Sequence, residues 1–305
     1  MKRVLILGGA GFIGQHLAFA MQNDYQITLY DREKRNDQFS FIEGDFVEEK
    51  DFDAILQSNQ INIIFHLIST TIPKEDTSDI VEEIQQNIIP TLRLLEAMRK
   101  QKDIRLIFVS SGGTVYGESK GEAHQTSDKC TPICGYGMQK IIIEQYMEFY
   151  RRRYKLDCRI ARLANPYGVP PQRPRGQGIV PIFLERLICG EPIALYGDTF
   201  RDYIHIDDAV KALISMTEYE GDQYCFNIGT GVGIRLSDMV RKIEEITGKQ
   251  FSEIRHFPIR QCDVMESILN IEETEKELLW HPGISLEDGI KRTWESIHAY
   301  HSVIK

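Results

Sequence analysis

The sequence predicts an α/β fold in which a doubly wound parallel sheet is followed by a smaller C-terminal α/β lobe. In the first half of the chain, short apolar runs rich in β-branched residues alternate with longer segments whose apolar residues recur every three or four positions. The short runs are apolar throughout, which is typical of parallel strands that are covered on both faces. Strands and helices that alternate at this spacing indicate repeated βαβ units.

The elements of the first half follow from these patterns. Parallel strands are expected at residues 4–7, 27–30, 63–67 and 106–109. A helix is expected directly after the first strand, and longer helices are expected at 80–98 and 138–150.

The composition changes near residue 166, where prolines and glycines crowd residues 166–178 and prevent either kind of element from continuing. We therefore expect a first domain at residues 1–168 and a substrate lobe at 169–305, with a segment at about 200–218 returning to the first domain. Helices in this second half are expected at 179–189, 207–216, 236–247 and 286–299.

Charge and composition exclude several classes of protein. Among 305 residues there are 36 Lys and Arg against 45 Asp and Glu, so the net charge is 36 − 45 = −9, which argues against a nucleic-acid partner. The six cysteines show no C-x-x-C spacing, so neither a metal site nor a dithiol redox motif is expected. No apolar run is long enough to span a membrane, and the chain enters a strand at once, which favours the cytoplasm.

A glycine-rich turn follows the first strand. Residues 8–14 read Gly-Gly-Ala-Gly-Phe-Ile-Gly and satisfy the G-x-G-x-x-G pattern between a strand and a helix. The missing side chains allow a tight turn, and the N–H groups at the helix start are suited to a pyrophosphate. Asp31, at the end of the second strand, is suited to the ribose hydroxyls and favours NAD over NADP. Arg32 leaves that preference open, because a guanidinium can also hold a phosphate.

A tyrosine and a lysine lie four residues apart at the start of the helix near 138. Tyr136 and Lys140 therefore project from the same helix face, one turn apart. A tyrosine with a pKa of about 10 becomes a base near neutrality only if its phenolate is stabilised by about 4 kcal/mol. Lys140 and a positive nicotinamide ring are suited to supply this. Ser111 or Thr114, at the end of the fourth strand, is a candidate to bind a substrate hydroxyl.

These motifs, in this order, resemble the extended short-chain dehydrogenase/reductases, specifically the nucleotide-sugar epimerase/dehydratase branch related to UDP-galactose 4-epimerase. The resemblance runs along nearly the whole chain and implies a Rossmann-type sheet that binds NAD. Besides Tyr136 and Lys140, it implies cofactor contacts from Gly8, Gly11, Phe12, Ile13, Gly14, Asp31, Arg32, Asp45, Phe46, Leu67, Ser69 and Asn87.

The resemblance also implies a nucleotide-sugar site. Asn165 lies in an R-x-x-N-x-Y-G element and corresponds to a sugar-nucleotide contact of the family. Arg201 and Arg260, the latter three residues before Asp263, correspond to arginines that grip the diphosphate, as bidentate guanidinium groups are suited to do. Ser267 corresponds to the residue that gates the sugar pocket, and its small size leaves room for a 2-acetamido group.

Two departures from the family pattern bear on the reaction. Gly112 occupies the position that carries the catalytic hydroxyl in typical epimerases, which leaves Ser111 or Thr114 to supply it. Gly113 and Thr114 replace the acidic pair of the family's dehydratases, so water elimination is disfavoured.

The resemblance therefore implies NAD-dependent epimerisation at C4 of a UDP-hexose, either UDP-glucose/galactose or the N-acetylhexosamine, through a 4-keto intermediate. One alternative is a reductase of a nucleotide-linked 4-keto-6-deoxy sugar that consumes NAD(P)H. Another is a non-catalytic protein that senses NAD(P). By analogy with the family, the helices at 80–98 and 138–150 are expected to form the interface of a homodimer.

Overall fold

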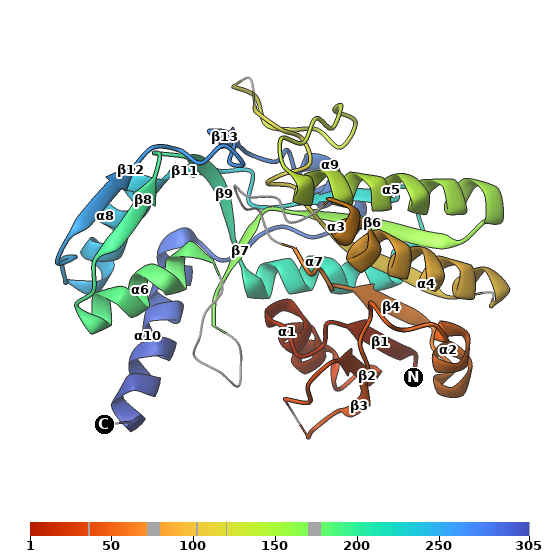
Figure 1. Cartoon of the computed structure of the whole chain (residues 1–305). Helices are drawn as coiled ribbons and strands as arrows, with labels where there is room; N and C mark the ends of the chain where they lie inside the picture. Colours follow the sequence, from red (N-terminus) through yellow and green to blue (C-terminus); the bar gives the residue numbers. More distant parts are fainter. Residues whose placement is uncertain (36, 72–79, 102, 120, 170–177, 305) are drawn as a thin grey trace.

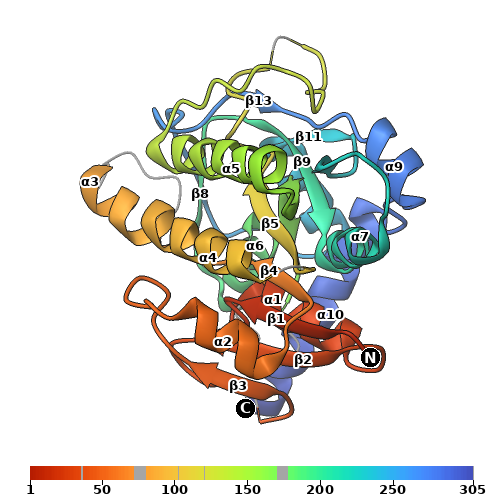
Figure 2. The same cartoon turned by 90° about the vertical axis from the view of Figure 1, so that its right-hand side faces the viewer.

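The computed structural model describes residues 1–35, 37–71, 80–101, 103–119, 121–169 and 178–304. Within them, a parallel sheet with the strand order β10-β6-β5-β4-β1-β2-β3 forms the main body (Figures 1 and 2). Its strands are β1 (Arg3–Leu7), β2 (Gln26–Asp31), β3 (Ser40–Glu43), β4 (Ile63–His66), β5 (Arg105–Ser111), β6 (Asp157–Leu163) and β10 (Cys225–Ile228).

This sheet confirms the predicted doubly wound α/β class. The four predicted strands are β1, β2, β4 and β5, and every neighbouring pair in the sheet is parallel. The strand order reverses between β1 and β4, and ligands of such sheets bind outside the carboxyl ends of the strands at that point. Three further strands, β3, β6 and β10, extend the sheet on both sides.

Helices cover both faces of the sheet. On one face, α1 (Phe12–Met21) and α7 (Ile206–Glu218) share a hydrophobic core with the sheet. On the other face, α2 (Phe52–Asn59), α4 (Ile89–Lys100) and α5 (Gly135–Tyr154) do the same. The helix α7 therefore lies in this layer, while the expected return of the whole segment at about 200–218 stays a prediction. The division at residue 168 stays a prediction.

The helix predicted at 80–98 has an irregular middle. It consists of α3 (Ile80–Glu83), a π-helical turn η1 (Ile84–Ile88) and α4. Pro90 lies in the first turn of α4, where its missing N–H is tolerated. In an unbroken α-helix its ring would clash with the carbonyl group four residues earlier, and the wider π turn avoids that clash.

The second lobe carries its own small sheets and its own core. The strand β9 (Phe200–His205) lies between β11 (Gly233–Arg235) and β13 (Glu266–Ser267) and also pairs with β7 (Asn165–Tyr167). A separate ribbon joins β8 (Ile193–Tyr196) to β12 (Ile254–Phe257). Three helices, which confirm predicted ones, pack in this lobe: α6 (Ile179–Cys189), α8 (Leu236–Thr247) and α10 (Leu286–Ile304).

The short helix α9 (Glu272–Leu278) returns to the first layer and packs against β10 and α7. Most of the proline-rich segment expected near residue 166 lies at 170–177, outside the described residues. Throughout the described segments, no helix combines the length and apolar character that a membrane span requires.

Candidate active site

A cavity of about 640 Å³ opens between the carboxyl ends of β5 and β6 and the second lobe. Its walls bring together residues from α1, β5, α5, β7, β9 and the segment before β13. The predicted site residues that line it are Ile13, Leu67, Ser69, Ser111, Thr114, Tyr136, Lys140, Asn165, Arg201, Arg260 and Asp263.

The glycine turn between β1 and α1 is too tight for side chains. A Cβ on Gly14 would lie 2.4 Å from the carbonyl oxygen of Gly8, and one on Gly11 would lie 3.1 Å from the same oxygen. Gly8 itself has a φ of 85°, a conformation that favours glycine. Phe12 then begins α1, and among the described residues no side-chain hydrogen bond caps the helix start, which leaves its first N–H groups available to an anion.

Asp31 ends β2 beside this turn. Its carboxylate accepts hydrogen bonds from the backbone N–H groups of Ala10 (3.0 Å) and Arg32 (2.8 Å). These bonds fix the carboxylate next to the glycine turn and leave further lone pairs for ribose hydroxyls. The Arg32 residue is exposed. The glycine turn and Asp31 together fit a dinucleotide and would hold NAD.

Three predicted cofactor residues, Asp45, Phe46 and Asn87, do not belong to the cavity lining. The Asp45 carboxylate accepts a hydrogen bond from the Val47 N–H (2.9 Å), and Phe46 is buried with its ring 4.9 Å from that of His66. Asn87 is buried in η1, and its side-chain amide both accepts from the Thr70 N–H (2.9 Å) and donates to the Thr70 hydroxyl (2.8 Å). Asn87 thus fixes the segment that follows β4. For all three, a contact with NAD stays a prediction.

Tyr136 and Lys140 face the cavity from the first turns of α5. Lys140 is 4% exposed, its Nζ donates to the carbonyl oxygen of Val109 (3.0 Å), and it lies 5.5 Å from the centre of the Tyr136 ring. Burial lowers the pKa of Lys140 to about 8. Burial raises the pKa of Tyr136 to about 12, against the effect of a hydrogen bond with Ser111. The phenol is therefore protonated in the protein alone, and its ionisation requires further positive charge nearby.

The hydroxyl partner of Tyr136 is the side chain of Ser111. The Ser111 hydroxyl interacts with the phenol and lowers the pKa of Tyr136, whereas the buried Thr114 Oγ1 has no hydrogen-bond partner within the described segments. A Cβ on Gly112 would lie 2.5 Å from Leu269 Cδ1 and 3.1 Å from the Arg162 carbonyl oxygen, so a side chain there requires Leu269 to shift. The packing of Leu269 therefore disfavours a side chain at position 112.

Two guanidinium groups lie on the wall contributed by the second lobe. Arg201 is buried, and its guanidinium donates to the carbonyl oxygen of Val264 while burial lowers its pKa. Arg260 donates from Nε to the Asp263 carboxylate (2.7 Å) and lies 5.3 Å from the centre of the Tyr196 ring. Both groups remain cationic, so this wall is suited to a diphosphate.

The side chains of Asn165 and Ser267 each donate a hydrogen bond to a backbone carbonyl oxygen. The Asn165 amide donates to the carbonyl oxygen of Asp202 (2.8 Å) and still lines the cavity. Ser267 is 3% exposed, lies outside the cavity lining, and donates to the Gly112 carbonyl oxygen (3.4 Å). Its role as a gate stays a prediction.

Other cavity residues escaped the sequence analysis. Cys134 lies directly before α5, Cys262 lies between Arg260 and Asp263, and Tyr196 ends β8. The two cysteines resemble ordinary core residues in the sequence. The only available signal of their place in the cavity was their closeness along the chain to Tyr136 and Arg260. Tyr196 precedes Arg201 closely, and an aromatic residue beside a cation was the available signal.

Comparisons with known proteins identify the family to which the chain belongs. The model of the NAD dependent epimerase/dehydratase family matches residues 4–229. A UDP-glucose 4-epimerase of Mycolicibacterium smegmatis is 32% identical, over 96% of this chain and 97% of its own. A dTDP-4-dehydro-6-deoxyglucose reductase of Escherichia coli is 31% identical, again over 96% of this chain and 97% of its own.

A solved structure gives the same result. The UDP-glucose 4-epimerase of Thermotoga maritima, determined with UDP-glucose, superposes with a TM-score of 0.90 at 32% identity, over 100% of both chains. With a family model that spans most of the chain and relatives above 30% identity, the chain belongs to the NAD dependent epimerase/dehydratase family.

Proposed function

We propose that the chain is an NAD-dependent isomerase that inverts C4 of a UDP-hexose. One observation carries the proposal: Tyr136 and Lys140 line the same cavity as Arg201 and Arg260. A substrate bound in this cavity would therefore meet the acid–base pair on one wall and two guanidinium groups suited to its diphosphate on the wall of the second lobe. The epimerase relatives support the same reaction.

The residues act on the substrate in a fixed order. Arg201 and Arg260 hold the diphosphate, and Ser111 steadies the oxygen on C4. Tyr136 takes the proton of the C4 hydroxyl and later returns it to the 4-keto sugar. Held by the glycine turn and Asp31, NAD would supply reversible hydride chemistry at C4, with no net consumption of coenzyme.

Lys140 supports the phenolate form of Tyr136. Its ammonium is 5.5 Å from the tyrosine ring, and in a site of low dielectric such a charge lowers the pKa of the phenol. The positive charge of oxidised NAD acts in the same direction. Because the pKa of Tyr136 is about 12 in the protein alone, the proposal requires this added charge before Tyr136 acts as a base.

A second candidate is a reductase of a nucleotide-linked 4-keto-6-deoxy sugar. The Escherichia coli reductase favours it, because its identity of 31% is almost that of the Mycolicibacterium smegmatis epimerase, 32%. The two reactions share Tyr136 and Lys140, but the reductase consumes one reduced coenzyme for each sugar and does not return the hydride.

One assay separates the two candidates. Purified protein is incubated with UDP-galactose, and separately with UDP-N-acetylgalactosamine, without added coenzyme, and the sugars are then analysed. Conversion to the C4 epimer supports the epimerase. If both UDP-sugars remain unchanged while NAD(P)H is oxidised in the presence of a dTDP-4-keto-6-deoxy sugar, the protein is the reductase instead.

We also propose that a second copy of the chain packs on α4 and α5, which lie side by side (Figure 2). Both helices expose large apolar side chains, namely Ile89 on α4 and Met138 and Phe149 on α5, at 38%, 49% and 49%. Exposed apolar side chains on adjacent helices are suited to an interaction surface. Light scattering should give the mass of a dimer, and Phe149→Glu should give a monomer. A monomeric wild-type protein would refute the proposal.

A further inference from the structure

Directly behind the cavity lies a buried ion pair that the proposed reaction does not use. Glu144, on α5, is 2% exposed, and Arg162, on β6, is 8% exposed. The guanidinium donates to both carboxylate oxygens, with Nη2 2.7 Å from Oε2 and Nε 3.3 Å from Oε1. A buried pair costs desolvation energy that is offset only by additional hydrogen bonds, so its further partners matter.

The carboxylate reaches the strand end that carries the hydroxyl partner of Tyr136. Ser110 Oγ donates to Glu144 Oε1 (2.5 Å), and the next residue, Ser111, carries the hydroxyl that lowers the pKa of Tyr136. Glu144 therefore ties the end of β5 to the helix that carries Tyr136.

Arg162 extends the same network away from the cavity. Its Nη1 donates to the Tyr116 hydroxyl (2.9 Å) and to the carbonyl oxygen of Thr126 (3.0 Å). Tyr116 donates in turn to the side chain of Asn227 on β10 (2.6 Å). The pair is thus fixed from three strands and one helix, so its geometry is rigid.

Glu144 also follows Lys140 by one helical turn, so both side chains lie on the same face of α5. The negative charge of Glu144 opposes the effect of burial on Lys140, whose pKa is about 8. Other titratable groups around this pair stay neutral, since burial raises the pKa of Cys225 and Cys130 and lowers that of His66 to about 3. Arg162 is the cation that faces Glu144 from the sheet.

We propose that Glu144 is a positioning residue of the active site, which keeps Lys140 as an ammonium group and fixes Ser111 against Tyr136. This inference rests on the proposed function for its catalytic meaning. Glu144 does not line the cavity, so it acts only through Lys140 and Ser111.

The first test measures Lys140 without any substrate. Competitive labelling with a small acetylating reagent at a series of pH values, read by mass spectrometry, reports the pKa of Lys140. Loss of the Glu144 charge in Glu144→Gln removes support for the ammonium form, so this pKa should fall further, by about one unit. Glu148→Gln, one turn later on α5, is the matched control and should leave it unchanged. An unchanged Lys140 pKa in a folded Glu144→Gln protein would overturn the proposal.

The second test measures turnover. In Glu144→Gln the alkaline limb of kcat should move to lower pH by the same amount, because Lys140 loses its proton earlier, while KM changes little. Ser110→Ala is the second variant, for use if Glu144→Gln fails to fold. It removes only the hydrogen bond from Ser110 to the Glu144 carboxylate, so the protein should still fold. It should lower kcat about tenfold without moving the limb, as expected when a positioning contact is lost.

The outcomes separate the two proposals. If the wild-type protein turns over no sugar nucleotide but labelling of Lys140 still responds to Glu144→Gln, the proposed function fails and the electrostatic link stands. If the wild-type protein is active and Ser110→Ala retains full kcat, the positioning role of Glu144 is rejected.

Discussion

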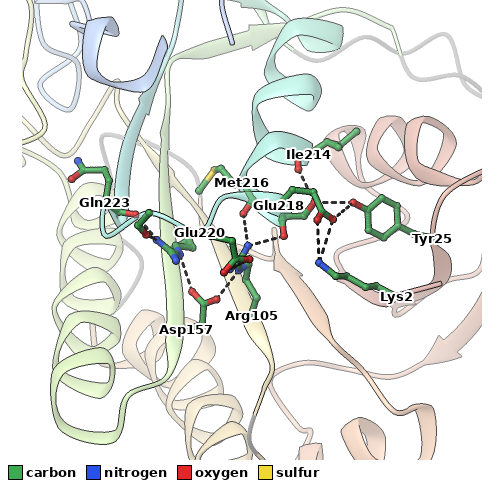
Figure 3. A network of polar contacts seen from close by, with 12 residues as sticks. Lys2, Tyr25, Arg105, Asp157, Ile214, Met216, Glu218, Glu220 and Gln223 are labelled. Atoms are coloured by element: carbon green, nitrogen blue, oxygen red, sulfur yellow. Dashed lines mark hydrogen bonds and ion pairs between the residues drawn. The ribbon is translucent and has the colours of Figure 1, made fainter. Parts of the chain in front are cut away.

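The adjacent strands β5 and β6 are held at each end by a buried arginine, and the two ends differ in their access to water. At the amino end, Arg105 donates to the Asp157 carboxylate (2.6 Å) and to the carbonyl oxygen of Thr217 at the end of α7 (2.6 Å) (Figure 3). Its acidic partners are open to solvent, with side-chain exposures of 34% for Asp157 and 81% for Glu220. At the carboxyl end, Arg162 and Glu144 have side-chain exposures of 9% and 2%.

Access to water decides what each buried arginine and its acidic partners do in the protein. At the amino end, solvent screens the charges, and the network serves to tie α7 to the sheet. At the carboxyl end, the low dielectric lets a charge shift the pKa of a neighbouring lysine that lines the cavity. We therefore expect substitutions at the carboxyl end to change turnover, and those at the amino end to change stability alone.

The largest effect is expected for Tyr136→Phe. Removing the phenolic oxygen removes the group that moves the C4 proton, and general acid–base groups contribute about 10²- to 10⁴-fold to rate. Turnover of a UDP-hexose should fall about 10³-fold, while NAD binding, followed by fluorescence, and the melting temperature stay unchanged.

Tyr224→Phe is the control for this substitution, since Tyr224 directly precedes β10 near the amino ends of the strands. It should retain full turnover. Substantial activity in Tyr136→Phe would remove Tyr136 from the reaction.

The strands that could be predicted from the sequence are those with uniformly apolar residues. Strands that contain charged or polar residues were missed. The strand β6 contains Arg159 and Arg162, and β10 contains Asn227, so neither reads as an apolar run. These polar groups are buried only because distant partners satisfy them, such as Glu144 for Arg162 and Tyr116 for Asn227. No local pattern reveals such partners.

The candidate site was predictable where its chemistry depends on local spacing. Tyr136 and Lys140 face the same cavity because four residues make one helical turn. The lack of a hydroxyl at position 112 fits Leu269, which fills the space beside Gly112 from a far part of the chain. The choice between Ser111 and Thr114 depends on which hydroxyl the fold brings to Tyr136. The sequence alone left that choice open for this reason.

The second effect, smaller than that of Tyr136→Phe, sharpens the choice of hydroxyl. Ser111→Ala should lower kcat about 10²-fold, because the oxygen on C4 loses a preorganised hydrogen bond. Thr114→Val keeps the volume of the side chain and removes a hydroxyl that has no hydrogen-bond partner in the described part of the chain. It should change kcat less than about threefold. Steady-state kinetics with UDP-galactose measure both, and the reverse order of effects would assign the role to Thr114.

The smallest effect is expected at the amino end. Arg105→Met leaves the Asp157 carboxylate and the Thr217 carbonyl without this donor, and should lower the free energy of unfolding in urea by about 2 kcal/mol. Turnover per folded molecule should not change, because the cavity lies at the opposite end of the strands.

In the same network, Lys2 pairs with Glu218 at side-chain exposures of 48% and 60% (Figure 3). Lys2→Ala is thus the control, with a cost below about 0.5 kcal/mol. Slower turnover in Arg105→Met, with stability retained, would contradict the separation between the two ends.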